Sequence, residues 1–136
     1  MKRRRSRASP HATVHLPERS WPSRADAFPG TEVKLIVNSD VGGADLYGGV
    51  IAIKPGVAIP IHFHRRGEIQ FVLSGHGFLL RPDGSETEVG PRSAVFSPRG
   101  RSGAHGFRAI GRRALEILFF YGSPSGLRPW IGRYTA

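Results

Sequence analysis

His62 and His64 stand two residues apart, and Glu68 follows after three intervening residues. Residues two apart in a strand point to the same face, so the two imidazoles would lie side by side. The connection from Arg65 to Gly67 is short enough for a hairpin, which would bring the Glu68 carboxylate beside the rings on the returning strand. Two imidazoles and one carboxylate suit a divalent first-row transition metal. The spacing therefore predicts a metal site.

The elements that must position these side chains are short strands separated by turns. Turn signals such as Pro55-Gly56 and Pro82-Asp83-Gly84-Ser85 divide segments rich in branched and aromatic residues. The pattern predicts strands over 31–38, 46–54, 58–64, 68–74, 78–80, 86–89, 94–97, 105–108 and 114–121. Short strands at this spacing are typical of an all-β sandwich or barrel. The tail from residue 123 is expected to fold back over the barrel as irregular structure or a short helical turn.

Basic side chains are concentrated near the N-terminus. The 136-residue chain has a formal net charge of +10, and residues 1–24 account for +6 of it, with seven cationic side chains and one acidic one. This region has no hydrophobic periodicity, so we expect residues 1–28 to be a disordered basic segment and residues 29–136 to form one β-barrel domain. The charge alone is weak evidence for nucleic-acid binding, because no helix-turn-helix pattern accompanies it.

The composition limits the chemistry and the compartment. The sequence contains no cysteine, which excludes disulfides, thiolate metal ligands and cysteine nucleophiles. It has no apolar stretch of membrane-spanning length and no signal-peptide core after the basic residues. We therefore expect a cytoplasmic protein without a membrane partner.

A family resemblance rests on five fixed positions, namely Gly56, His62, His64, Glu68 and Gly75. Their spacing matches the first signature of the cupin superfamily, and the chain resembles a small single-domain cupin over residues 32–121. The resemblance implies a double-stranded β-helix, or jelly-roll barrel, that holds one divalent ion such as iron, manganese, nickel, zinc or copper. It also implies a small-molecule ligand and, as in many small cupins, a homodimer.

The second cupin signature is represented less completely. Pro98-Arg99-Gly100 supplies its turn, but Arg92 replaces its first glycine and Ala109 stands where the family often has asparagine. His105 arrives two residues later than the signature expects. The extra residues fall in a glycine-containing loop, which can absorb an insertion. The resemblance therefore implies His105 as a fourth metal ligand, with a histidine beside or at the rim of the site as the alternative.

Alternation along the strands identifies the side chains expected around the metal. Gln70 and Phe107 should face the barrel interior. Gln70 could contact a substrate or be satisfied by a neighbour, and Phe107 could be a core residue or a substrate platform. Counting back from His62 places Ala58 and Pro60 on the same face, where they would leave space near the ion.

Two further pocket candidates come from their chemistry. Tyr47 could supply a proton to a bound molecule. Arg65, together with Arg66, Arg99 and Arg101, flanks the ligand segments and could form a cationic rim for an anionic substrate. The alternative is that these arginines are solvated loop residues.

Two classes of function remain open. The first is a metal-dependent enzyme that acts on a small, possibly anionic, organic molecule. A mixed His/Glu ligand set with open positions favours an iron- or nickel-type dioxygenase, while isomerase, cyclase and lyase reactions are alternatives. The second is a binding protein that holds a small ligand or a metal without turnover.

Overall fold

The computed structural model describes residues 11–18, 28–40, 45–126, 128 and 130–135. Most of the predicted disordered segment, residues 1–10 and 19–27, lies outside the described residues. Phe28, at the end of that segment, is buried and belongs to the hydrophobic core. Among the described residues, no helix has the length and apolar character needed to cross a membrane.

The regular secondary structure of the described chain consists of ten strands and three short 3-10 turns. The strands are β1 (Thr31–Val37), β2 (Leu46–Ile53), β3 (Ala58–His64), β4 (Glu68–Ser74), β5 (His76–Leu80), β6 (Glu86–Val89), β7 (Ala94–Ser97), β8 (His105–Ile110), β9 (Leu115–Gly122) and β10 (Ile131–Arg133). The turns are η1 (Leu16–Glu18), η2 (Arg101–Gly103) and η3 (Pro124–Gly126).

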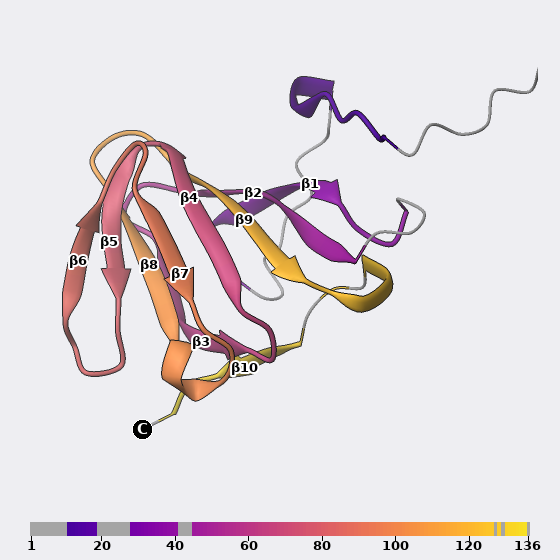
Figure 1. The fold of residues 1–136 in the computed structure, drawn as a ribbon. Coiled ribbons are helices and arrows are strands. Elements are labelled where there is room, and N and C mark those ends of the chain that lie inside the picture. The colour runs from indigo at the N-terminus through magenta and orange to yellow at the C-terminus, as the bar shows by residue number, and fades with distance from the viewer. Residues whose placement is uncertain (1–10, 19–27, 41–44, 127, 129, 136) are drawn as a thin grey trace, which may run out of the picture.

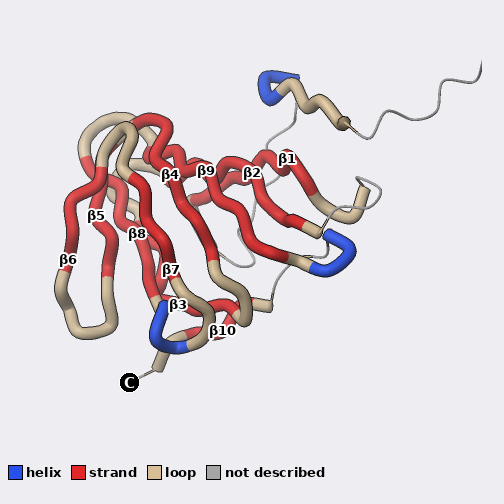
Figure 2. The backbone as a smooth tube through the Cα atoms, in the orientation of Figure 1, coloured by secondary structure: helices blue, strands red, loops and turns tan. Residues whose placement is uncertain are grey.

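The strands form two five-stranded antiparallel sheets (Figure 1). One sheet has the order β1-β2-β9-β4-β7 and the other has the order β10-β3-β8-β5-β6. From β2 to β5 and again from β6 to β10, successive strands alternate between the two sheets (Figure 2), so the chain winds as a jelly roll. The predicted all-β jelly-roll barrel is confirmed.

Two glycines allow the chain to turn on either side of the two strands that carry His62, His64 and Glu68. Gly56 precedes β3 with φ of +80°, and Gly75 lies between β4 and β5 with φ of +82°. L-residues with a side chain rarely adopt this conformation. At Gly75 an added Cβ would also lie 2.3 Å from the backbone oxygen of Ala114. The spacing of these glycines therefore marks turns that bound β3 and β4.

The core lies between the sheets, and β4 illustrates how alternation produces it. Glu68, Gln70 and Val72 are buried, whereas Ile69 and Phe71 on the opposite face are exposed. The inward face of this strand therefore carries two polar residues at one end and an apolar residue further along. The polar end faces the interior of the barrel where the candidate site lies.

The expectation for Ala58 and Pro60 is wrong. The register between β3 and β8 shifts between Ile59 and His62, which marks a β-bulge. The extra residue reverses the alternation, so Ile59 and His62 are both buried while Ala58 is exposed. Ile59, and not the smaller Ala58 or Pro60, therefore lies beside the histidine in the barrel interior.

Candidate metal centre

Strand register brings the ligand candidates together from three strands. His62 and His64 share the inward face of β3, and His105 opens β8 directly opposite His62. Glu68 is the first residue of β4. The three histidines each offer a ring nitrogen, and these nitrogens lie within 4.8 Å of one another. All four side chains are buried.

The backbone fixes which ring nitrogen of each histidine faces the centre. Nδ1 of His62 lies 2.8 Å from the carbonyl oxygen of Pro60, and Nδ1 of His105 lies 2.8 Å from that of Gly103. Nδ1 of His64 faces the carbonyl of Trp130 at 3.3 Å. A carbonyl oxygen can only accept, so each Nδ1 carries the proton and donates it. In the neutral rings, Nε2 is then the unprotonated nitrogen, which is the one that a metal-binding histidine uses.

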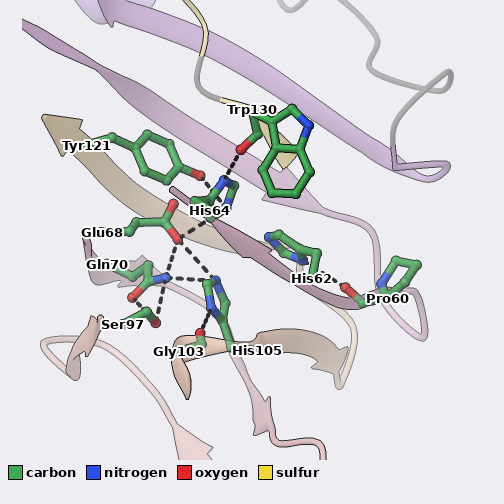
Figure 3. A network of polar contacts seen from close by, with 10 residues as sticks. All are labelled: Pro60, His62, His64, Glu68, Gln70, Ser97, Gly103, His105, Tyr121 and Trp130. Atoms are coloured by element: carbon green, nitrogen blue, oxygen red, sulfur yellow. Dashed lines mark hydrogen bonds and ion pairs between the residues drawn. The ribbon is translucent and has the colours of Figure 1, made fainter. Parts of the chain in front are cut away.

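Glu68 lies beside two of the imidazoles, and Figure 3 shows it joined to both. Its Oε1 atom is 3.0 Å from Nε2 of His105 and 3.8 Å from Nε2 of His64. Burial by itself would raise the pKa of this carboxyl. The hydrogen bond and electrostatic interaction with His105, the interaction with His64 and the hydroxyl of Tyr121 outweigh burial, so the pKa of Glu68 is lowered and the group is ionised at neutral pH.

The donor set fits a divalent metal ion. Nε2 of His105 lies 3.0 Å from the Glu68 carboxylate oxygen, so a proton or a divalent cation can be shared between these two atoms. Two atoms that bind one first-row ion at about 2.1 Å and at right angles to each other lie about 3 Å apart. Burial, with a smaller effect of the His105 imidazole, lowers the pKa of His62 from 6.5 to about 3. His62 is therefore neutral and able to ligate at neutral pH.

Gln70 connects the ligands to a second buried hydroxyl. Its amide nitrogen hydrogen-bonds the Glu68 carboxylate and lies 3.0 Å from Nε2 of His105. Ser97 donates its hydroxyl proton to the amide oxygen of Gln70 at 3.3 Å, which fixes the orientation of the amide (Figure 3). Gln70 therefore holds the position of Glu68 from the side opposite to Tyr121, whose hydroxyl lies 3.1 Å from Nε2 of His64.

A cavity opens beside these residues inside the barrel. Besides His62, His105, Glu68 and Gln70, the described residues that line it are Phe28, Ile51, Ile59, Phe107, Ile117, Phe119, Tyr121 and Ile131. Gln70 and Phe107 thus lie where alternation placed them. Tyr47 is buried, with its ring 6.4 Å from that of Tyr121, and is not among the described residues that line the cavity.

The arginines near the ligands contact aromatic rings outside the cavity. The guanidinium of Arg65 lies 4.7 Å from the ring centre of Trp130, and that of Arg101 lies 4.4 Å from the ring centre of Tyr134. Arg101 also donates a hydrogen bond to the carbonyl of Thr135. Neither arginine is among the described residues that line the cavity. The side chains that flank the ligands in sequence therefore do not supply positive charge to its wall.

Several residues of this site were not singled out from the sequence. Tyr121 lies in the strand predicted over 114–121, where alternation with Phe119 would turn both side chains inward and leave Phe120 outside. Phe28, whose ring lies 4.8 Å from that of His62, precedes the first strand and belongs to no periodic segment. Ile131 lies on β10, a three-residue strand with no recognisable pattern of its own.

Comparison with known proteins identifies one family and several solved structures that share the fold. A family model described as "Cupin domain" matches residues 49–121. No curated protein matches the chain. Among solved structures, the polyketide cyclase RemF from Streptomyces resistomycificus is 25% identical with a TM-score of 0.79, covering 93% of this chain and 87% of that one.

Two further structures share the fold at lower identity. KdgF from a Halomonas species is 20% identical with a TM-score of 0.68, over 84% of this chain and 96% of its own. A predicted oxalate decarboxylase from Thermotoga maritima is 19% identical with a TM-score of 0.69, over 83% of this chain and all of its own. At this identity the two structures support the fold of the chain and carry no information about its reaction.

Proposed function

The chain belongs to the cupin family, and from this premise we propose that it binds one divalent transition metal ion through His62, His64, Glu68 and His105 and acts on a small organic molecule at that ion. When bound, such an ion polarises a carbonyl or enol oxygen of a ligand that coordinates it. The chain's own residues supply the remaining functions: they hold the ligand, exclude water and hold protons near it.

One observation carries the proposal. Three buried imidazoles from β3 and β8 each donate Nδ1–H to a backbone carbonyl and turn Nε2 toward a common centre. The backbone carbonyls therefore orient all three rings as they are oriented in metal-binding histidines. A divalent ion is a ligand that these three inward nitrogens and the Glu68 carboxylate could bind together.

Among reactions, we favour acid–base chemistry of the cyclase, isomerase or lyase kind. The structure with 25% identity and the TM-score of 0.79 is a polyketide cyclase, which supports this class without assigning its substrate. Within this chain, the Tyr121 hydroxyl lines the cavity 3.1 Å from Nε2 of His64 and could hold a proton for a bound carbonyl compound. Glu68, on the same side, could accept one.

A dioxygenase is the second candidate. The observation in its favour is the mixed set of three imidazoles and one carboxylate, which suits redox-active iron or nickel. Turnover separates the two classes, because a cyclase, isomerase or lyase reaction proceeds without oxygen and a dioxygenase consumes one O₂ per product.

We also propose that the protein is a homodimer. Support comes from four large apolar side chains exposed on the outer face of β4 and β7, which we call the β4–β7 patch: Ile69, Phe71, Leu73 and Phe96. Ile69 and Phe96 are register partners, so the patch is continuous, and β7 is the last strand in its sheet. A continuous group of apolar side chains at a sheet edge suits pairing with the identical group of a second copy by two-fold symmetry.

Elemental analysis of the purified protein, after reconstitution with Fe²⁺, Mn²⁺, Ni²⁺, Zn²⁺ and Cu²⁺ in turn, tests the central proposal. We expect one ion per chain in the wild type and its loss in His62→Ala. His76→Ala is the matched control, because His76 is exposed on β5 and lies outside the cluster. A wild-type protein that retains none of these ions would refute the proposal. Turnover of ligands that bind, measured with and without oxygen, then distinguishes an acid–base enzyme, a dioxygenase and a binding protein.

A further inference from the structure

The cavity wall beside the proposed metal site is almost entirely apolar. Its apolar side chains come from both sheets: Ile51, Ile117 and Phe119 from one, and Ile59, Phe107 and Ile131 from the other. Phe28 adds a ring from the segment before β1. Branched and aromatic side chains therefore line this space from both sheets, an environment that favours apolar groups over charged ones.

Charge in the cavity is confined to the proposed ligand set. Among the described residues that line it, Glu68 is the one carboxylate, and none is lysine or arginine. Arg65 and Arg101 stack on Trp130 and Tyr134 outside the cavity. A substrate with several negative charges would therefore have no side-chain cation to pair with inside the barrel.

The net charge of the proposed metal site further restricts the class of ligand that it can bind. A divalent ion and one carboxylate leave a single net positive charge among neutral imidazoles. A ligand that coordinates as a monoanion, such as an enolate or a phenolate, brings the buried site to neutrality. A dianion such as oxalate or a phosphate ester leaves an unpaired negative charge in an apolar cavity, which is strongly unfavourable.

Three observations support the inference: the apolar wall, the position of Arg65 and Arg101 outside the cavity, and this charge balance. From them we infer that the substrate is a neutral, apolar and ring-containing compound with an enolisable carbonyl or a phenol. It would place its oxygen atoms toward His62 and His105 and its carbon skeleton against Phe107 and Phe119. This inference rests on the proposed function, which it deepens by naming the substrate class. It also replaces the anionic molecule that the arginine-rich flanks suggested.

Ligand titrations of the Co²⁺-reconstituted protein test the inference, with the visible absorption of the ion and calorimetry as readouts. Benzoylacetone and oxalate both present two oxygens, but the first coordinates as a monoanion and carries a phenyl ring. We expect benzoylacetone to bind more tightly than oxalate and fructose 6-phosphate. It should also bind about tenfold or more tightly than acetylacetone, because a phenyl ring rather than a methyl group leaves water. Equal or tighter binding of oxalate or fructose 6-phosphate, or equal binding of the two diketones, would overturn the inference.

A charge-introducing variant tests the role of the wall. Ile51→Arg places a cation in the cavity, and Leu46→Arg places the same residue at an exposed position of the same strand, β2, as a control. We expect the first to narrow or reverse the preference for benzoylacetone over oxalate and the second to leave it unchanged. An unchanged preference in a folded Ile51→Arg protein would contradict the inference. If that variant does not fold, the wild-type comparison of the two diketones decides the same question.

Metal-free protein separates this inference from the proposed function. There, 2-naphthol should bind and quench the intrinsic fluorescence, while the charged 2-naphthoate should bind at least several-fold more weakly. If the protein binds no metal but shows this selectivity, the proposed function fails and the apolar site stands. If the protein binds metal but prefers 2-naphthoate, the inference about the substrate fails and the proposed function stands.

Discussion

The pH dependence of stability in the metal-free protein follows from the burial of His62. Its pKa is lowered from 6.5 to about 3, first by desolvation and second by the His105 imidazole, while the Pro60 carbonyl partly opposes both. As pH falls below 6.5, the unfolded chain takes up a proton at this position and the folded chain does not. The free energy of unfolding must therefore decrease on acidification, and the stability that neutral His62 allows is fully present above pH 6.5.

The size of this decrease in the free energy of unfolding depends on how far the pH falls below 6.5, the pKa of the histidine in the unfolded chain. One pKa unit corresponds to about 1.4 kcal/mol, so acidification from pH 6.5 to pH 5 should remove about 2 kcal/mol from the free energy of unfolding. The depressed pKa of Glu68 acts in the same direction, but its effect begins only as pH approaches the unfolded value of 4.5. Between pH 5 and 6.5 the contribution of His62 can thus be separated from that of Glu68.

Urea denaturation of the metal-free wild type and of His62→Gln, at intervals from pH 5 to pH 8, measures this effect. Glutamine fills part of the same space and does not titrate, so the difference between the two pH profiles isolates His62. We expect the wild type to lose about 2 kcal/mol more than the variant between pH 6.5 and pH 5. Parallel profiles would show that His62 is accessible to protons in the folded protein, which would refute its assignment as a buried neutral ligand.

Three further predictions concern the turn, the fourth ligand and the subunit contact. Gly75→Ala should destabilise the protein by about 2–4 kcal/mol, because it combines φ of +82° with a backbone contact, whereas Gly84→Ala, at φ of +85° with no atom within 4 Å, should cost about 1 kcal/mol by thermal unfolding. His105→Ala should lower metal affinity by about tenfold or more in competition titrations with a chelator, and unchanged affinity would remove His105 from the ligand set. Phe96→Asp should shift the protein from dimer to monomer in sedimentation velocity without lowering its metal content, and an unaltered dimer would exclude the β4–β7 patch as the interface.

Most strands could be located from the sequence because each carries its own periodicity. The predicted ranges 58–64, 68–74, 86–89 and 94–97 coincide with β3, β4, β6 and β7. The strand β5 begins at His76, two residues earlier than predicted, because His76 pairs with Ile110 across the sheet although its side chain is exposed. The prediction of an irregular tail after residue 123 holds for η3 but misses β10.

What the sequence could not provide depends on contacts between distant segments. The strand β10 has three residues, and it exists because Ile131, Gly132 and Arg133 pair with β3. The bulge in β3 depends in the same way on its register with β8. Alternation assumes a regular strand, so it assigned the space beside His62 to Ala58 when Ile59 fills it. Arg65 is not among the described residues that line the cavity; its guanidinium lies over the ring of Trp130, a contact between residues distant in sequence.

His105 shows how an altered signature can still place a histidine in the candidate site. The two additional residues before it fall within η2, where the close approach of Gly103 to the Pro98 carbonyl, which a Cβ would meet at 1.7 Å, keeps the loop compact. The loop therefore ends at the start of β8, where His105 pairs in register with His62. The carbonyl of Gly103, which lies in that loop, accepts a hydrogen bond from Nδ1 of His105, so that Nε2 points inward. Because strand pairing sets the position of the imidazole and a loop carbonyl sets its orientation, the length of the intervening loop can vary as long as both conditions are met.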